Sequence, residues 1–516
     1  MFCRNLRLLL PLAPLLLGIS ACALYFPTLP TQVQSTAPAI APTVEQVEQP
    51  TEAAPTTVPP TAVMPAPVPT EQDRLPRTQY DLRVSFDYDA HRLAVRQSIQ
   101  YFNQAGEALT DLRLVVRPLR WAGSFNLESL AWADGTPVAG VETEGHLLHI
   151  PLPEVLEPGG QVGLRLVYEL NLPELPPGGA ATGPELYGYT WRQANLVDWY
   201  PYLPPYRSGQ GWLAHEAAYF GEYLVYEPAD FQVQISLAEP VPGLVLTGSG
   251  AAMAAQDGQT YSFSLSAGRA FAWSASPQYQ ALSAQVGEAT VTSYFFPSHA
   301  GGGQAALEAT TQALALYAEL FGEYAHPSLA VVEADFVDGM EYSGMYFLSR
   351  DFYDWYDGSP RGLLTTIAAH ETAHQWWFEQ VGSDQALEPW LDEALCTYME
   401  RLFYERLEAQ SPTGEDGSLV DWWWRFRVDY YQPTGWVDGT IYDYKDFLQY
   451  RDAVYLRGAK FLEALRGEMG AAAFLAFLQE YARQMGGRLA TAEDFFGLLE
   501  EYAPGGVEGL REEYFG

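Results

Sequence analysis

The amino-acid sequence predicts a multidomain protein, in which an N-terminal antiparallel β-sandwich is followed by a mainly helical domain. Between residue 80 and about 284, apolar and polar residues alternate in short runs such as 231–237, separated by Gly, Pro and Asp turns. Alternation with a period of two is typical of half-buried strands, and roughly 200 residues of it suit a β-sandwich. From about residue 294 the apolar residues recur at helical spacing instead, for example along 304–321. We therefore place the two domains at 77–288 and 289–516.

Composition limits what such a protein can do. The chain has 516 residues, of which 48% are hydrophobic and 14% aromatic, so it can bury a large core and is not disordered as a whole. Its formal net charge is −36. Nucleic-acid binding requires clustered cations, so nucleic acid is excluded as a partner. An acidic surface also disfavours electrostatic docking on anionic lipid.

The first 22 residues are predicted to be a secretion signal. Arg4 and Arg7 precede an apolar stretch, 8–18, that is too short to span a bilayer comfortably. Small residues then lead to Cys22, in a pattern that resembles a bacterial lipobox. Cys22 would then carry lipid and anchor the chain to the cell membrane; the alternative is an ordinary signal peptide cut nearby. Both interpretations place the mature protein outside the cytoplasm.

Residues 23–76 are predicted to form a disordered tether. The segment contains twelve prolines, many threonines and almost no aromatic residues, so it cannot bury a core. Once Cys3 is removed with the signal and Cys22 is lipidated, only Cys396 remains as a free thiol. The mature chain therefore has no disulfide framework, and we expect Cys396 to be a small buried residue.

The strongest chemical signal is the run His370-Glu371-Thr372-Ala373-His374. We predict that it lies on a helix capped by Ser359 and ended by Gly382. Two histidines one turn apart can point at the same ion, and the glutamate beside them can take a proton from a metal-bound water. The alternative is a pair of hydrogen-bonded core histidines.

A third metal ligand is predicted on the next helix, which we expect to begin at Pro389. The short connection after Gly382 would fold this helix back on the first one, so that Glu393 could reach the two histidines. The alternative is a surface acid of a first helical turn, an interpretation that also suits Glu388 and Asp392.

These residues resemble a known family. The run His370-Glu371-Thr372-Ala373-His374-Gln375-Trp376-Trp377, followed by Trp390-Leu391-Asp392-Glu393, is similar to the zinc aminopeptidases typified by aminopeptidase N and leukotriene A4 hydrolase. The resemblance implies a gluzincin, that is, a thermolysin-like α+β metallopeptidase domain. It also implies one zinc ion held by His370, His374 and Glu393, with Glu371 as general base.

Gly339, Met340 and Glu341 resemble the Gly-Ala-Met-Glu-Asn strand of that family. The resemblance implies that Glu341 binds the free α-amino group of a peptide substrate, through a charge-assisted hydrogen bond. Asp338 stands where the family has its first glycine, and Tyr342 stands where it has asparagine.

Tyr455, in Val454-Tyr455-Leu456-Arg457-Gly458-Ala459, looks like the family's tyrosine that donates a hydrogen bond to the oxyanion. Gly458, inside a helical pattern, suggests close packing against a neighbouring helix. The resulting prediction is a lipid-anchored zinc aminopeptidase acting on peptides. Two alternatives remain open: a zinc endopeptidase or other hydrolase of the same fold, and a non-catalytic surface-binding lipoprotein.

Overall fold

The period-two segments of the first half of the chain form strands, as predicted. The computed structural model describes residues 76–176, 185–254, 258–410, 417–503 and 505–516. The predicted signal, Cys22 and the predicted tether up to residue 75 lie outside the described residues. In the strand Gln79–Asp87 every second residue is buried, including Leu82, Val84 and Phe86. This one-sided burial is the reason for the alternation in the sequence.

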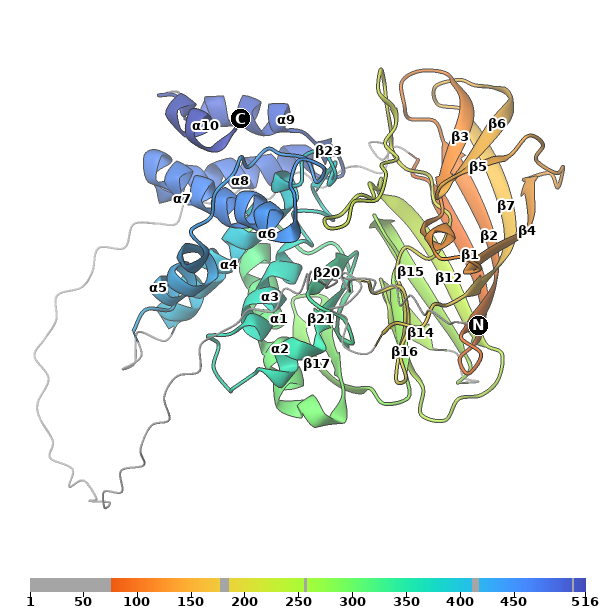
Figure 1. The fold of residues 1–516 in the computed structure, drawn as a ribbon, viewed down its shortest axis with the longest axis horizontal. Helices are drawn as coiled ribbons and strands as arrows, with labels where there is room; N and C mark the ends of the chain where they lie inside the picture. The colour runs from red at the N-terminus through yellow and green to blue at the C-terminus, as the bar shows by residue number, and fades with distance from the viewer. Residues whose placement is uncertain (1–75, 177–184, 255–257, 411–416, 504) are drawn as a thin grey trace, which may run out of the picture. The chain divides into compact units, whose positions relative to one another are not determined.

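The largest sheet formed by these strands has seven of them, in the order β14-β15-β12-β1-β2-β7-β4 (Figure 1). Its strands are β1 (Gln79–Asp87), β2 (Arg92–Phe102), β4 (Phe125–Trp132), β7 (Gln161–Asn171), β12 (Ala229–Leu237), β14 (Ala251–Ala254) and β15 (Thr260–Gly268). The prediction of a wholly antiparallel arrangement is wrong at one pair, because β1 and β12 run parallel, with Tyr80 opposite Phe231. The stacked rings of these two residues, 5.0 Å apart, show one side-chain contact between strands that are distant in sequence.

Smaller sheets complete this β-rich region. They comprise β3 (Leu109–Val115), β5 (Glu142–Glu144) and β6 (Leu147–Leu156); β8 (Gly188–Tyr189), β9 (Ala194–Leu196), β13 (Val245–Gly248) and β16 (Trp273–Ser276); and the hairpin β10 (Tyr206–Arg207) with β11 (Gly211–Trp212). The two-layer packing of a β-sandwich remains a prediction.

A five-stranded sheet with the order β17-β18-β19-β21-β20 opens the second region. Its strands are β17 (Gln280–Val286), β18 (Ala289–Phe295), β19 (Ser328–Ala334), β20 (Gly339–Tyr342) and β21 (Met345–Ser349). β17 and β18 form a hairpin, so this sheet already begins at Gln280, before the predicted domain boundary at 288/289. The helices α1 (Ala300–Phe321) and α3 (Leu363–Ala373) pack against the sheet and against each other (Figure 1).

The rest of this region is helical, as predicted. The helices are α1 (Ala300–Phe321), α2 (Arg350–Asp354), α3 (Leu363–Ala373), α4 (Trp390–Gln410), α5 (Leu419–Trp423), α6 (Phe447–Tyr450), α7 (Gly458–Met469), α8 (Ala471–Met485), α9 (Ala492–Tyr502) and α10 (Glu508–Tyr514), with a short strand pair, β22 (Gly382–Ser383) and β23 (Leu489–Ala490). Wide π-helical turns occur at Trp424–Val428 and Arg451–Arg457. None of the helices within the described ranges has both the length and the apolar character needed to cross a membrane.

The helix that carries the two histidines is shorter than predicted. α3 begins at Leu363, where the preceding Gly362 has an extended backbone, and Ser359 caps only a local turn through the N–H of Arg361. The α-helix ends at Ala373 rather than near Gly382. After Ala373 the chain continues in wider turns. In one of them the N–H of Glu379 bonds to the carbonyl of His374, five residues back.

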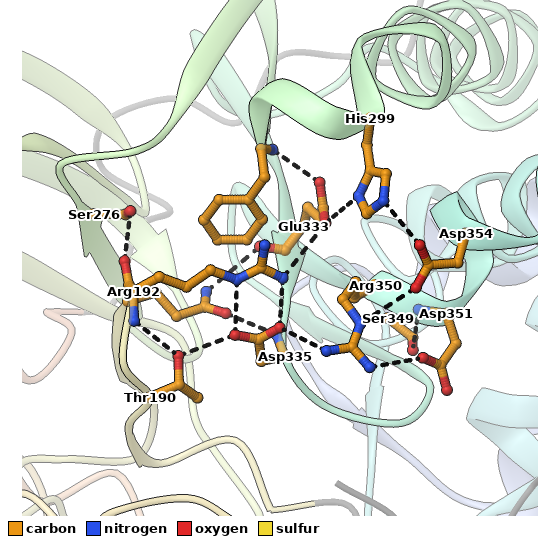
Figure 2. Close-up of polar contacts among 12 residues, drawn as sticks. Thr190, Arg192, Ser276, His299, Glu333, Asp335, Ser349, Arg350, Asp351 and Asp354 are labelled. Atoms are coloured by element: carbon orange, nitrogen blue, oxygen red, sulfur yellow. Dashed lines mark hydrogen bonds and ion pairs between the residues drawn. The ribbon is translucent and has the colours of Figure 1, made fainter. Parts of the chain in front are cut away.

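A buried ion-pair network joins the β-rich region to β19 (Figure 2). Arg192, between β8 and β9, binds both oxygens of Asp335 at 2.9 and 2.5 Å. On the other side of Figure 2, His299 lies between Glu333 (2.7 Å) and Asp354 (2.9 Å). Buried charges that are paired in this way hold their partners in one geometry. The network therefore fixes residues 335–338, which lead into β20.

Arg269 forms a second link between the regions. Its buried guanidinium donates hydrogen bonds to the backbone carbonyls of Tyr226 (2.8 Å), Glu379 (3.0 Å) and Arg488 (2.8 Å). A Cβ at Gly382 would collide with this guanidinium, so glycine is required there. Arg269 thus joins the β-rich region to the turn after α3 and to the C-terminal helices.

Candidate active site

The two histidines of α3 are buried and lie side by side. His370 and His374 are 4% and 1% exposed, and their ring centroids are 4.8 Å apart. α3 packs against α4, which begins after Pro389 as predicted; the N–H of Glu393 bonds to the carbonyl of Pro389. The structure therefore places the first turn of α4 opposite the histidines.

Each histidine is oriented by a carboxylate at Nδ1. His370 Nδ1 lies 2.9 Å from Glu400 Oε1, and His374 Nδ1 lies 2.7 Å from Asp392 Oδ1. A neutral histidine that donates its Nδ1–H to a carboxylate keeps Nε2 as the lone-pair donor, which is the arrangement found around metal-binding histidines. Both Nε2 atoms are therefore free to bind a metal ion.

The three predicted ligands converge. Glu393 Oε2 lies 3.1 Å from His370 Nε2 and 3.7 Å from His374 Nε2, and all the ligand atoms lie within 4.8 Å of one another. Two ligands on one tetrahedral zinc ion are about 3.3 Å apart when each bond is about 2.1 Å. These spacings and the His/His/Glu donor set fit zinc.

Cys396 also lies near this group, with Sγ 3.3 Å from His374 Nδ1. Its side chain is fully buried, as predicted, and burial raises the pKa of the thiol well above its ordinary value. A thiol binds metal as the thiolate. Cys396 lies at Nδ1 of His374 and therefore on the other side of the ring from Nε2, which faces Glu393.

Glu371 occupies the position expected of a general base. Its Oε2 is buried and has no hydrogen-bond partner among the described residues, and burial raises the pKa of the carboxyl well above its ordinary value. β20 passes directly beside it: a Cβ at Gly339 would collide with this carboxylate and with Ile367. The glycine thus allows the strand to approach the base closely.

Tyr455 reaches the same group from the π-helical turn Arg451–Arg457. Its hydroxyl donates a 2.5 Å hydrogen bond to Glu393 Oε1, and its ring lies nearly parallel to that of His370 at 6.0 Å. A Cβ at Gly458 would collide with Ala394, so the close packing predicted there is confirmed, and it is against α4. This contact brings Tyr455 down to the metal donors.

Glu341 lies on β20, at the edge of the five-stranded sheet. It is only 5% exposed and accepts a 3.2 Å hydrogen bond from Gln385. Burial raises the pKa of Glu341 to about 7.

Asp338, at the start of the strand, has a φ of 149°, a backbone conformation that favours glycine. Its carboxylate accepts a hydrogen bond from Gly339 N at 3.0 Å.

A cavity of about 220 Å³ adjoins Glu341 and reaches into the β-rich region. Glu222 lines it from the loop that precedes β12, and no side chain of the described residues forms a hydrogen bond or ion pair with its carboxylate. Burial, and then the charges of Glu393 and Glu341, raise the pKa of Glu222 well above its ordinary value. Gly221, with a φ of 76°, fixes the loop against Tyr450. No pattern in the sequence indicated Glu222.

Two further site residues were missed or misread from the sequence. Asp392 is no surface acid, because it is 1% exposed, binds His374 and accepts from Gln385 at 2.8 Å. Glu400, which was not predicted, is fully buried and also accepts hydrogen bonds from Trp423 (2.8 Å) and Arg427 (2.9 Å). Glu400 lies seven residues, or two turns, after Glu393 on the same face of α4, and this spacing could have indicated it.

This donor set, with a carboxylate and a tyrosine beside it, defines the metal centre of a zinc metallopeptidase. Residues 305–514 match the model of the peptidase family M1 domain. This match to the family model confirms the resemblance inferred from the sequence, and the family implies one catalytic zinc ion.

Relatives of known structure share the fold of both regions. An M1 zinc metallopeptidase from Deinococcus radiodurans gives a TM-score of 0.60 at 20% identity, over 86% of this chain and 94% of that one. A mutant M1 zinc metallopeptidase of the same organism, bound to a Tyr-Ser-Ala substrate, gives 0.59 at 19% identity with the same coverage.

In sequence, the chain is similar to Aminopeptidase M1-D from Oryza sativa subsp. japonica, at 26% identity over 227 residues. These residues are 40% of this chain and 25% of that protein. The match thus spans only about a quarter of the length of the rice relative.

Proposed function

We propose that the protein is a zinc aminopeptidase, which hydrolyses the first peptide bond of peptides that have a free N-terminus. The observation that carries the proposal is the cavity that Glu341 and Glu222 line beside the metal donors. Neither carboxylate forms an ion pair within the described part of the chain, so the two favour a positively charged ligand, and a peptide's α-ammonium supplies one. The related structure bound to Tyr-Ser-Ala supports a peptide as the substrate.

Each residue of the centre then has a role in hydrolysis. His370, His374 and Glu393 would hold the zinc ion, which when bound would supply a Lewis acid to polarise the scissile carbonyl and to make a water more acidic. Glu371, whose Oε2 has no protein partner, takes the proton of the attacking water and passes it to the leaving amine.

Tyr455 stabilises the oxyanion that develops as water attacks. Its hydroxyl already points at the donors, through the hydrogen bond to Glu393 Oε1. To donate to the substrate oxygen, the hydroxyl of Tyr455 has to leave Glu393 for a new partner in the same site. A hydrogen bond of this kind stabilises the transition state by roughly 3–4 kcal/mol. Asp392 and Glu400 hold the two histidines in the tautomer that binds metal.

The test compares aminoacyl amides with their N-acetylated counterparts, before and after the protein's metal is removed by a chelator. We expect release from the free-amine substrates alone, its loss with chelator, and its recovery when zinc is restored. The acetyl group removes the positive charge and leaves the scissile bond unchanged. Equal cleavage of both series would contradict the role of the two carboxylates.

One observation favours a second candidate, a zinc endopeptidase of the same fold. Tyr342 stands where the family that the sequence resembles has asparagine, and its hydroxyl is directed at Asp198 (3.3 Å) in the β-rich region. Cleavage of internal bonds in an N-acetylated peptide, with no release of single residues, would select this candidate.

We further propose that the protein acts outside the cytoplasm, anchored to the cell membrane by a lipid on Cys22. The support is the sequence pattern alone: an apolar stretch followed by small residues and a cysteine. Labelled fatty acid should be incorporated into the wild type and not into Cys22→Ala. A wild-type protein that takes up no label, or that remains in the cytoplasm, would contradict the proposal.

A further inference from the structure

The cavity beside Glu341 extends away from the metal donors into the β-rich region. Beyond the two carboxylates its wall is mainly apolar. Its aromatic and aliphatic residues include the following six: Leu186, Val197, Tyr223, Leu224, Tyr226 and Phe378. Five of the six come from the β-rich region. If an α-ammonium lies at Glu341 and Glu222, the side chain of the same residue extends along this wall.

Beyond Glu341 and Glu222, three charged groups of the wall are already paired with one another. Arg117 binds Glu185 at 2.6 Å and Asp198 at 3.1 Å. Asp198 also accepts a 2.5 Å hydrogen bond from Tyr226. An acidic side chain would meet these carboxylates and a basic one would meet the guanidinium, so neither finds a free opposite charge.

Arg120, the other cation that lines the cavity, is exposed and already occupied by aromatic partners. It donates to the hydroxyl of Tyr223 at 3.2 Å, and its guanidinium lies over the rings of Tyr223 (5.4 Å) and Trp121 (5.8 Å). Such a cation over a ring is attracted to it without a carboxylate. Together the two arginines and their partners leave the wall beyond the carboxylates electrically balanced.

The size of the cavity matches a ring. A dry cavity of roughly 150 Å³ accepts benzene, so a volume of about 220 Å³ holds a phenyl, phenol or indole group. We propose that the enzyme prefers peptides whose first residue is aromatic and uncharged. This inference rests on the proposed aminopeptidase function and adds the class of side chain that is accepted.

The first test measures kcat/KM of the wild type on Phe, Tyr and Trp amides beside Ala, Glu and Lys amides. The aromatic amides should exceed each of the others by at least about tenfold, because a buried apolar group of this size discriminates by that factor or more. Equal or better cleavage of the Glu or Lys amide would overturn the inference and leave the aminopeptidase function in place. No cleavage of any free-amine amide would contradict that function itself.

A second test narrows the cavity. Ala218 lines it and its neighbour Ala217 does not, although both are partly buried. Ala218→Phe should lower the kcat/KM ratio of the Phe amide to the Ala amide at least about fivefold, mainly through KM. Ala217→Phe is the matched control and should leave the ratio unchanged. An unchanged ratio in Ala218→Phe, with zinc content retained, would overturn the inference.

Discussion

The helical and β-rich regions contribute to the site in different ways. In the helical region the predicted metal donors and general base lie within 24 residues of chain, where helical spacing and the packing of α4 on α3 bring them together. The β-rich region contributes Glu222 and the wall of the cavity from loops more than 100 residues away from those donors. The catalytic groups thus depend on local spacing, and substrate recognition depends on how the two regions pack.

The largest effect is expected from the general base, in the helical region. Glu371→Ala should lower kcat by roughly 10³-fold or more, because it removes the carboxylate that we propose takes the proton of the attacking water. Zinc content, measured by elemental analysis, should stay at one per chain because Glu371 is not a ligand. Full activity in this variant would contradict the mechanism, and loss of zinc would show that Glu371 holds the metal.

Tyr455→Phe should lower kcat by about 10²- to 10³-fold, with little change in KM, because it removes a donor that acts on the transition state. The matched control is Tyr450→Phe, since Tyr450 packs against Tyr455 at 5.6 Å and its buried hydroxyl forms no hydrogen bond with the described residues. A decrease in kcat of the same size in both variants would indicate disturbed packing rather than a lost hydrogen bond.

The link between the regions is tested by Arg269→Met. Three backbone carbonyls, two of them in buried hydrogen bonds, would lose their donor, which should cost about 3 kcal/mol of unfolding free energy. Thermal or urea unfolding measures this cost. Arg483→Met removes an exposed pair with Glu480 and should cost well under 1 kcal/mol. Equal costs would show that the buried link is unimportant.

The difference between the helical and the β-rich region also explains what could be predicted from the sequence. Helix periodicity was enough to place His370 and His374 on one face, and a short connection was enough to bring Glu393 opposite them. It was not enough for Asp392, because an acid in a first helical turn has the same pattern whether it faces solvent or a buried histidine. Only the packing of α4 on α3 distinguishes the two cases.

In the β-rich region the alternation predicted strands but not their partners. β1 pairs with β12, about 150 residues away, in parallel, and nothing in either strand specifies that neighbour. The position of Glu222 depends on this pairing, since Glu222 lies in the loop that leads into β12. Alternation with a period of two predicts which side chains of a strand are buried. It does not predict which strands pair or which loops come together.

Glu222→Gln tests the contribution of the β-rich region to the proposed substrate site, because it changes a residue of that region and leaves the helical region unaltered. We expect kcat/KM for free-amine substrates to fall by roughly tenfold to a hundredfold, since the substrate's ammonium loses one of two carboxylates. Glu185→Gln is the matched control, as Glu185 lines the same cavity but is paired with Arg117. A smaller loss in Glu222→Gln than in the control would remove Glu222 from the ammonium site.

The smallest expected effect concerns pH. Burial raises the pKa of Glu227, in the loop before β12, to about 7, and the charge of Arg269 only partly opposes this. In the unfolded chain this carboxyl ionises near pH 4.5, so between pH 4.5 and 7 the folded state binds more protons and stability falls as the pH rises.

Glu227→Gln removes that penalty. The variant should gain clearly more unfolding free energy over the wild type at pH 8 than at pH 5, where the wild-type carboxyl is still protonated in the folded state. Glu480→Gln is the control: Arg483 lowers the pKa of Glu480 to about 2, so its carboxylate is ionised at both pH values and the variant's effect should not change between them. Urea unfolding at the two pH values measures both differences. A gain in Glu227→Gln that is equal at pH 5 and pH 8 would show that the carboxylate of Glu227 is not buried at the junction of the two regions.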